Sequence, residues 1–266
     1  MKNQLQLLFL LILAFVIVQT STAQNAGFFV GLNGSYNMTI VANQMNYGQK
    51  EMDYDGATLN PSFGLTIGYD INGKSQLSVG AGISNGGQKY NDTYGSDNLK
   101  KHIKLSYLSI PVLFTQVFSK TDKIEKGTKF FVRIGPQFSF LQSASVEHTV
   151  NDHDVTLEIF ANYLAGGGNF LNFNADAIHK LVINGEPSED KSLFNSLDIA
   201  GVLGLGIKTY FNSNFSLDIE LRGGGSLTDI NADAWHLDGF KDGKRSAYGP
   251  SRNVFGGLNI GLNYKF

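Results

Sequence analysis

Residues 253–266 read Asn-Val-Phe-Gly-Gly-Leu-Asn-Ile-Gly-Leu-Asn-Tyr-Lys-Phe, and this C-terminal stretch decides the fold. From Leu258 to Phe266 every second residue is large and apolar, and the residues between are Asn, Gly or Lys. A period of two is typical of a β-strand with one apolar face and one small or polar face. The stretch closes on an aromatic residue and shows no turn signal after it.

The same alternation recurs in seven earlier stretches, which predicts eight strands. Their expected bounds are Gly27–Met38, Ser62–Ile71, Leu77–Ser84, His102–Phe118, Val132–Phe140, Leu197–Tyr210 and Phe215–Gly224. Long and short connections alternate between them, as in outer-membrane barrels with long external loops and tight periplasmic turns. We therefore predict an all-β, eight-stranded antiparallel up-and-down transmembrane barrel, with ten strands as the alternative if residues 145–165 extend it.

The N-terminus indicates export. Lys2, the apolar run Leu5–Val18 and the small residues at 21–23 have the form of a cleavable signal peptide over residues 1–23, which leaves a barrel domain over 24–266. The chain has no cysteine, which excludes lipidation and disulfides. No later run suits a membrane helix, so an exported chain of this kind enters a membrane only as a closed barrel.

These features place the protein in the outer membrane of a diderm bacterium, after cleavage of the signal peptide. We expect a monomer in contact with outer-membrane lipid. We also expect the barrel-assembly machinery to read a C-terminal signature made by Leu262, Tyr264 and Phe266. With 21 basic and 23 acidic residues the chain has no basic excess, so no nucleic-acid partner is expected.

Three local patterns refine the barrel. Asn72-Gly73 predicts a type I′ hairpin turn, in which both central residues have positive φ. In the stretch 102–118 the apolar residues change parity at Tyr107 and Leu108, which predicts a bulge that absorbs one residue close to Pro111. Nine aromatic residues fall near the expected periplasmic ends and predict an interfacial girdle. They are Tyr69, Phe118, Phe130, Phe131, Tyr210, Phe211, Phe215, Tyr264 and Phe266.

Charged residues on the inward parity form the main candidate site. The cations are Lys104, Arg133, Lys208 and Arg222, and the anions are Asp198, Asp218 and Glu220. A selectivity filter would use such charges. However, eight strands enclose an interior that side chains just fill, so opposed charges are expected to pair into a plug. We predict a lumen charge network of Arg133, Asp198, Lys208, Asp218, Glu220 and Arg222.

Other chemistry has weaker support. His148, Asp152, His153 and Asp154 lie close together in a predicted external loop and could hold a metal, but solvated loop polarity explains them better. The glycines of 201–206 superficially resemble a nucleotide-binding motif but lie inside a strand. No serine nucleophile motif or paired carboxylate accompanies the histidines. We therefore predict no enzyme activity, cofactor or metal.

Four short motifs, in order, resemble the PorT-like family of outer-membrane β-barrels. They are Tyr-Leu-Ser-Ile-Pro-Val at 107–112, Ile-Gly-Pro at 134–136, the Asp-Ile-Ala-Gly stretch at 198–206 and Gly-Ser-Leu-Thr-Asp-Ile at 225–230. The resemblance covers nearly the whole chain and implies an eight-stranded barrel. Roles in that family vary and include a type IX secretion accessory. Residues 144–195 depart most from its pattern.

Two kinds of function follow. The first is an integral outer-membrane barrel with a largely occluded lumen, whose long external loops carry specificity in a structural, secretion-accessory or surface-interaction role. The alternatives are a secreted soluble barrel that carries a small apolar ligand, or a narrow porin-like channel. A soluble carrier needs its apolar parity inside and its charged parity outside, so the direction in which each parity faces distinguishes the two architectures.

Overall fold

The computed structural model describes residues 26–42, 53–94, 97–119, 126–154, 190–232, 239–241, 244–246 and 249–266. The predicted signal peptide lies outside these residues, as does the segment 155–189. Among the described residues, no helix has the length and apolar character needed to cross a membrane.

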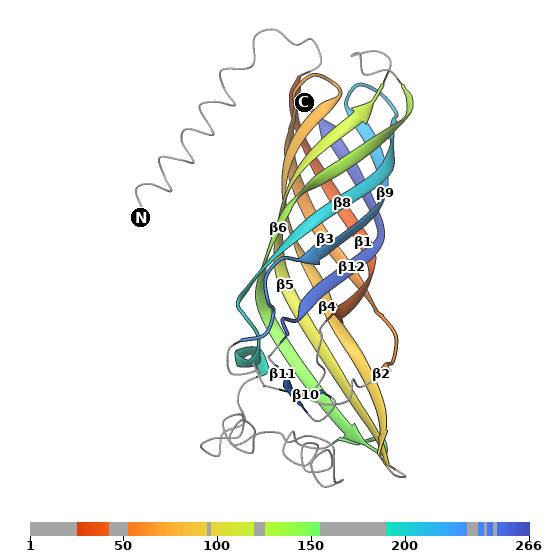
Figure 1. Ribbon diagram of the computed structural model, residues 1–266. Coiled ribbons are helices and arrows are strands. Elements are labelled where there is room, and N and C mark those ends of the chain that lie inside the picture. The colour runs from red at the N-terminus through yellow and green to blue at the C-terminus, as the bar shows by residue number, and fades with distance from the viewer. Residues whose placement is uncertain are drawn as a thin grey trace, which may run out of the picture.

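Eight antiparallel strands close into a ring, which confirms the predicted barrel (Figure 1). They are β1 (Gly27–Ala42), β3 (Thr58–Asp70), β4 (Ser75–Tyr94), β5 (Asp97–Phe118), β6 (Gly127–Val150), β8 (Leu197–Tyr210), β9 (Phe215–Ser226) and β12 (Arg252–Lys265). Each pairs with its neighbours along the chain, and β1 pairs with β12 to close the ring. The Phe266 N–H adds a 3.0 Å hydrogen bond to the Phe28 carbonyl.

Five short elements lie outside the ring. They are β2 (Asp53–Tyr54), β7 (His153–Asp154), the 3-10 helix η1 (Asp190–Leu193), β10 (Gly239–Lys241) and β11 (Lys244–Ser246). β2 pairs with β4 and β7 pairs with β6, so both attach to the wall of the barrel. Residues 145–150 continue β6, and 155–165 lie outside the described residues. The eight described strands already close on one another through the β1–β12 pairing, so the ten-strand alternative is wrong.

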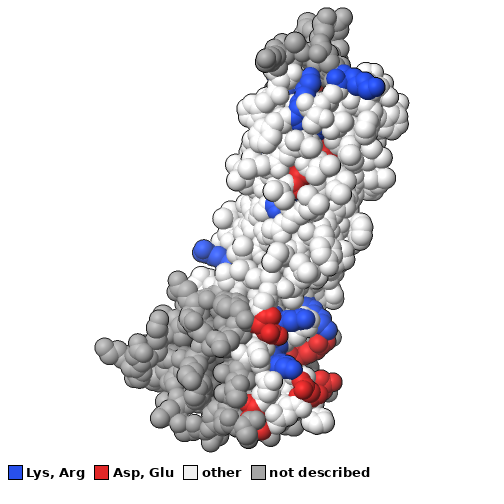
Figure 2. Space-filling model, turned by 90° about the vertical axis from the view of Figure 1, so that its right-hand side faces the viewer, with Lys and Arg blue, Asp and Glu red and all other residues white. Residues whose placement is uncertain are grey.

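The apolar parity faces outward. Leu221 and Phe63 keep 69% and 68% of their surface exposed, while polar residues such as Thr115 and Asp218 are buried inside. Figure 2 shows a largely uncharged wall, with Lys, Arg, Asp and Glu gathered toward its ends. This facing suits a barrel surrounded by lipid. It is opposite to the facing of a soluble carrier, so that alternative is wrong.

The turn between β3 and β4 differs from the predicted type I′ hairpin. Gly73 has a positive φ of 80°, but Asn72 is not among the described non-glycine residues with positive φ. Four residues, 71–74, join the strands, and side chains hold them: Asp70 accepts from the Gly73 N–H at 2.6 Å, and Asn72 accepts from the Ser75 N–H at 2.8 Å. Asx side chains can replace the backbone bonds of a tight turn, and that competition decided the outcome.

Three strands are much longer than predicted. β4, β5 and β6 have 20, 22 and 24 residues, whereas β9 has 12. The predicted external loop 85–101 is instead a hairpin in which only residues 95–96 separate β4 from β5. In Figure 1 these strands run past the rest of the barrel, and we call this part, residues 84–107 and 141–150, the external extension.

A bulge lies at the predicted level, but on the neighbouring strand β6 and not on β5. Odd-numbered residues of β5 from Lys101 to Val117 face inward, including Ile103, Leu105 and Tyr107, which are buried. The register shift lies between β5 and β6, where Ser106 pairs with Ser143 and Tyr107 with Leu141, so the extra residue is Gln142 of β6. The apolar parity changes because the surroundings change: inside the membrane apolar residues face lipid, and in the external extension they form an inner core.

The same inversion corrects the position of Lys104. It was predicted to face the lumen, but it is exposed on the outer face of β5 and forms an ion pair with Glu147 of β6. Lys100, also on the outer face, pairs with Asp152 at 2.5 Å. These pairs lie on the hydrated side of the external extension.

The aromatic girdle is present with two exceptions. Phe131 and Tyr210 are buried and face inward, because each falls on the inward parity of its strand. The outward rings contact one another across neighbouring strands, with centroid distances of 5.8 Å for Phe118–Phe130 and 4.8 Å for Phe215–Tyr264. Such ring pairs suit the membrane interface at the periplasmic end.

A buried histidine makes the external extension sensitive to pH. His148 lies opposite Lys101 across β5 and β6. Burial, and then repulsion from Lys101, lowers the pKa of His148 to about 3. The unfolded chain titrates near an ordinary histidine pKa of about 6.5. Between the folded and unfolded pKa values, His148 is protonated in the unfolded chain but neutral in the folded extension. The extension is therefore fully stable above pH 6.5 and loses stability as the pH falls.

We expect acidification from pH 7.5 to 5 to destabilise the external extension by about 2 kcal/mol. Hydrogen exchange of residues 141–150, corrected for the intrinsic exchange rate, measures this loss. The H148Q variant should remove most of the pH effect, and a smaller part should remain because burial also lowers the pKa of His102 in the same extension. The H153Q change at an exposed position should keep the full effect. An H148Q protein with the same pH dependence as the parent would contradict the assignment to His148.

Candidate functional site: the barrel interior

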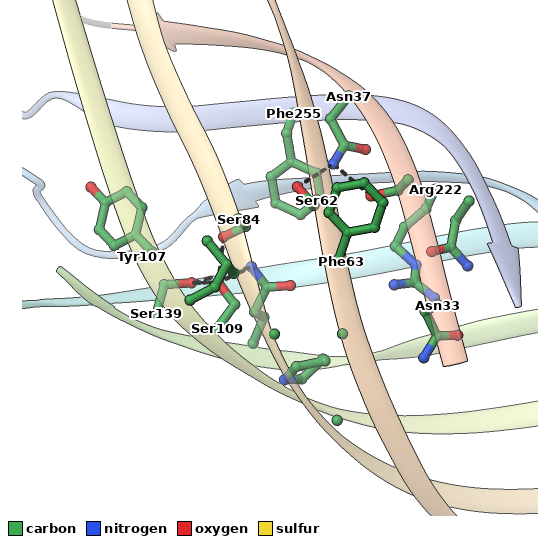
Figure 3. Close-up of a pocket in the computed structure, with 18 of the residues that line it drawn as sticks. Asn33, Asn37, Ser62, Phe63, Ser84, Tyr107, Ser109, Ser139, Arg222 and Phe255 are labelled. Carbon is green, nitrogen blue, oxygen red and sulfur yellow. Dashed lines mark hydrogen bonds between the residues drawn. The ribbon is translucent and has the colours of Figure 1, made fainter. Parts of the chain in front are cut away.

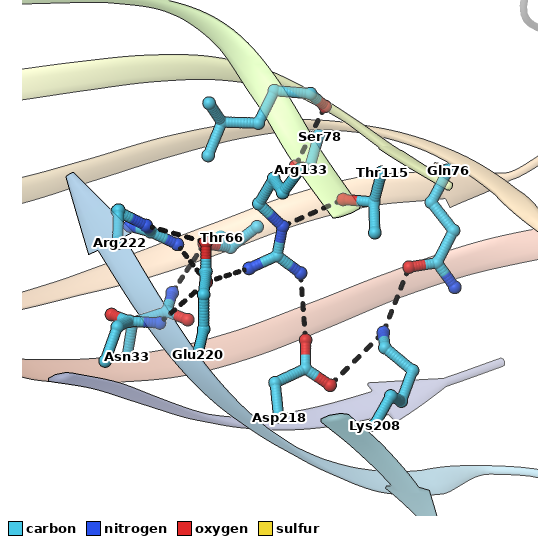
Figure 4. A network of polar contacts seen from close by, with 12 residues as sticks. Asn33, Thr66, Gln76, Ser78, Thr115, Arg133, Lys208, Asp218, Glu220 and Arg222 are labelled. Atoms are coloured by element: carbon cyan, nitrogen blue, oxygen red, sulfur yellow. Dashed lines mark hydrogen bonds and ion pairs between the residues drawn. The ribbon is translucent and has the colours of Figure 1, made fainter. Parts of the chain in front are cut away.

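A chain of ion pairs crosses the barrel interior and joins three strands (Figure 4). Arg133 of β6 donates to Glu220 of β9 at 2.7 Å and to Asp218 of β9 at 2.9 Å. Lys208 of β8 lies 3.3 Å from the other Asp218 oxygen. Arg222 of β9 donates to Glu220 at 2.8 Å. We call these five residues the ion network.

The sequence places these groups together through strand parity and register. Asp218, Glu220 and Arg222 are two residues apart and so share the inward face of β9. Lys208 is paired with Asp218 in the β8–β9 register, and Arg133 is opposite Gly204 in the β6–β8 register. Five of the six predicted network residues are therefore in mutual contact.

The ion network is almost fully desolvated. The Glu220 and Lys208 side chains keep 0% and 2% of their surface exposed, and the Arg133 side chain keeps 10%. Neutral groups bind further polar atoms of the two cations: Thr115 accepts from Arg133 at 2.8 Å, and Gln76 accepts from Lys208 at 3.0 Å. Buried charges tolerate such burial only when they are paired and hydrogen-bonded, as here.

The glycines of β8 make room for this network. A Cβ at Gly204 would collide with the Glu220 carboxylate, and a Cβ at Gly206 would lie 2.8 Å from the Phe131 ring. The resemblance of residues 201–206 to a nucleotide-binding motif therefore has another explanation, which is close packing inside a narrow barrel.

Asp198, the sixth predicted member, lies apart from the ion network. It accepts from Ser226 at 2.7 Å, from Thr228 at 3.0 Å and from Asn253 at 3.1 Å. Asn253 also donates to the Tyr107 hydroxyl at 3.2 Å. Asp198 thus belongs to a second polar cluster, at the level where the barrel meets the external extension.

A cavity of about 130 Å³ reaches from the ion network to Asp198 (Figure 3). Short uncharged side chains cover much of its wall. Ser84 and Ser109 lie 2.6 Å apart, Ser109 and Ser139 lie 3.0 Å apart, and Asn37 donates to Ser62 at 3.2 Å. The Phe255 ring adds an apolar surface.

One ion pair of the interior was not predicted. Lys265 of β12 donates to Asp70 of β3 at 3.1 Å. Asp70 shares its parity with Gly64, Thr66 and Gly68, so this signal was present in the sequence. The pair lies at the periplasmic end, where Gln76 also donates to Asp70 at 3.3 Å.

The predicted histidine cluster does not come together. His148 is buried inside the external extension, whereas Asp152, His153 and Asp154 are exposed. Asp152 and Asn151 have positive φ of 64° and 50° and form the tight turn between β6 and β7. In the part of the chain that the structure describes, no group of three His, Asp or Glu side chains could hold a metal ion.

Comparison with known proteins gives a family match and several similar structures. A family model described as the outer membrane protein beta-barrel domain matches residues 21–232. Neisserial surface protein A is 13% identical, with 91% of this chain and 100% of that chain covered and a TM-score of 0.42. OprG from Pseudomonas aeruginosa is 14% identical, with 92% and 98% covered and a TM-score of 0.36.

The outer membrane enzyme PagL is 12% identical, with 88% of this chain and 97% of that chain covered and a TM-score of 0.38. No curated protein sequence matches the chain.

Proposed function

Because the chain belongs to the outer membrane protein beta-barrel domain family, and is thus an integral barrel of the outer membrane, we propose that it is a non-conducting barrel that acts through its external side. The ion network carries the first half of this proposal. Arg133 reaches across the interior from β6 to two carboxylates of β9, and the atoms that join these strands are almost fully buried. A water-filled pore would need these groups solvated, and an eight-stranded interior has little space beyond its side chains.

The external extension supports the second half. On its outer face Lys104 of β5 pairs with Glu147 of β6, and Lys100 of β5 pairs with Asp152. Its inner face has an apolar core, so the extension is an ordered structure. A structured surface beyond the membrane suits a surface-interaction role. A secretion-accessory role is the more specific form of this proposal, and its support is the resemblance of four motifs to the PorT-like family.

The conduction half is tested with the purified full-length protein in planar lipid bilayers. We expect no stable large conductance, because the ion network replaces water across the interior. A persistent, ion-selective channel in the intact protein would refute this half and identify a narrow porin instead.

The surface half is tested with two variants. One replaces residues 155–189 with a short Gly-Ser linker, and the other replaces the β4–β5 hairpin of the external extension, residues 84–107, in the same way. Both variants should remain heat-modifiable on gels, since the ring of strands is intact. Partner capture from surface-crosslinked cells should be lost in at least one of them. Capture that survives both changes would place the binding surface elsewhere.

We also propose that the barrel-assembly machinery recognises Leu262 and Tyr264, which project from the outer face of β12, together with the exposed Phe266 that follows the strand. The F266A change removes the ring but keeps the backbone hydrogen bond to Phe28. We expect lower outer-membrane levels in cells and unchanged spontaneous refolding into lipid vesicles. Equal losses in both assays would assign Phe266 a structural role only.

A further inference from the structure

The seam between β3 and β4 opens before either strand ends. Their paired register stops at Phe63 and Ile83. Beyond this pair β3 continues to Thr58, in register with β1 alone, and β4 continues in register with β5. Pro61 lies on this part of β3 and has no N–H to donate to a ladder.

Side chains bridge the open stretch. The Asn85 amide donates to the Pro61 carbonyl at 3.2 Å. Farther out, Thr58 donates to the Gly87 carbonyl at 3.1 Å and lies 2.7 Å from the Thr39 hydroxyl. The seam is therefore closed below by the ladder and above by the threonine cluster. Among the described residues, the Asn85 side chain is its only hydrogen-bonded bridge between them. We call this stretch the window.

The cavity described above reaches this window. Its wall includes the inward residues Ser62 and Ser84, and also Phe63 and Ile83, which face the lipid with 68% and 49% of their surface exposed. Ser62 and Phe63 of β3 and Ile83 and Ser84 of β4 border the window, so the cavity lies directly behind it.

The chemistry of the cavity favours an uncharged polar guest. The nearby charges already have partners: Arg222 is paired with Glu220, and Asp198 accepts three hydrogen bonds. The remaining wall combines uncharged hydroxyl and amide groups with apolar surface, which includes the Phe255 ring. On a scale where one water needs about 10–15 Å³, a cavity of about 130 Å³ holds a small polar head but no acyl chain.

We propose that the cavity binds the head of a single-chain amphiphile with an uncharged, hydroxyl-bearing head, which enters sideways from the bilayer through the window. The head hydrogen bonds to Ser62, Ser84 and Asn37, and the apolar tail stays outside against Phe63 and Ile83. This site is independent of the conduction and surface roles proposed above.

The test uses the full-length protein in lipid nanodiscs that contain a monoacylglycerol with a diazirine close to its head. After illumination, mass spectrometry should find labelled inward residues, Phe255 and Asn37, as well as labelled lipid-facing residues outside the cavity, such as Leu221. Labels on lipid-facing residues alone would overturn the proposal. A diazirine fatty acid, which carries a carboxylate, should label the inward residues much less. Equal inward labelling by both probes would refute the preference for an uncharged head.

Two variants act on the window in opposite directions. S84W fills it and should abolish inward labelling while leaving Leu221 labelled. S213W makes the same change in an exposed periplasmic turn and should have no effect. N85A removes the bridge to Pro61 and should increase inward labelling. If S84W fails to fold, N85A still decides the matter, because unchanged or reduced inward labelling in that variant contradicts entry through the window.

Discussion

The R133M variant is expected to lose about 3 kcal/mol of stability, the lower end of the range of about 3–5 kcal/mol for breaking a buried ion pair from one side. The substitution removes the guanidinium group, which is the only cation of the ion network that contacts both Asp218 and Glu220. The loss falls at the lower end because Lys208 remains beside Asp218 and Arg222 remains beside Glu220. Urea titrations of the refolded barrel in lipid vesicles measure the change.

The matched control is K104M, which removes an ion pair on the outer face of the external extension. Exposed pairs contribute about 0–1 kcal/mol, so this variant should unfold close to the parent. If R133M is no less stable than K104M, the buried pairs are not what holds β6 against β9. Conductance recordings of R133M in planar bilayers add a second measurement, because a weakened ion network should admit water first at this level.

The I219R variant should destabilise the barrel by about 2–4 kcal/mol if Ile219 lies close to the bilayer midplane. Ile219 projects outward from β9 between Ile207 and Ile260, its partners in the neighbouring strands. Arginine at this position puts a charge into hydrocarbon. Refolding titrations in vesicles of different acyl-chain length measure the effect, and thinner bilayers should reduce it.

The control for this change is S35R. Ser35 lines the cavity, which has room for a longer side chain and uncharged polar groups, such as Asn37 and Ser62, to bind it. S35R should therefore cost less than I219R. The reverse order would mean that the polar parity faces the lipid, in conflict with the exposed rows of Leu and Ile on the barrel wall.

Strand number, closure and facing could be predicted from the sequence because inside a membrane the apolar residues of each strand face lipid. The predicted facing was wrong for the external extension, where the surroundings are water. At Ile103 and Leu105 the inward residues are apolar because water is outside, so the same alternation implies the opposite facing. A bulge on the same strand is the simplest explanation of a parity change when the strand lies in one environment. β5 instead runs from hydrocarbon into water, so its apolar residues change sides without a bulge.

The candidate site was predictable in part. Parity identified Arg133, Asp218 and Glu220 as inward, but parity does not determine height along the barrel. Asp198 is ten residues from Lys208 along β8, which is roughly 33 Å of extended strand and far beyond the reach of a side chain. The window could not be predicted at all, because it depends on where the β3–β4 register stops.

The inversion of polarity along β5 also determines how deep the protein sits in its membrane. If the barrel sank toward the periplasm, Lys104 and Glu147 would be carried into hydrocarbon, and if it rose, outward residues such as Leu108 and Phe114 would be carried into water. Both displacements cost free energy, since charge is penalised in lipid and apolar surface is penalised in water. β5 thus fixes the depth of the barrel in the membrane. Because Asn85 pairs with Ser106, between Lys104 and Leu108, the window lies at the boundary between hydrocarbon and water.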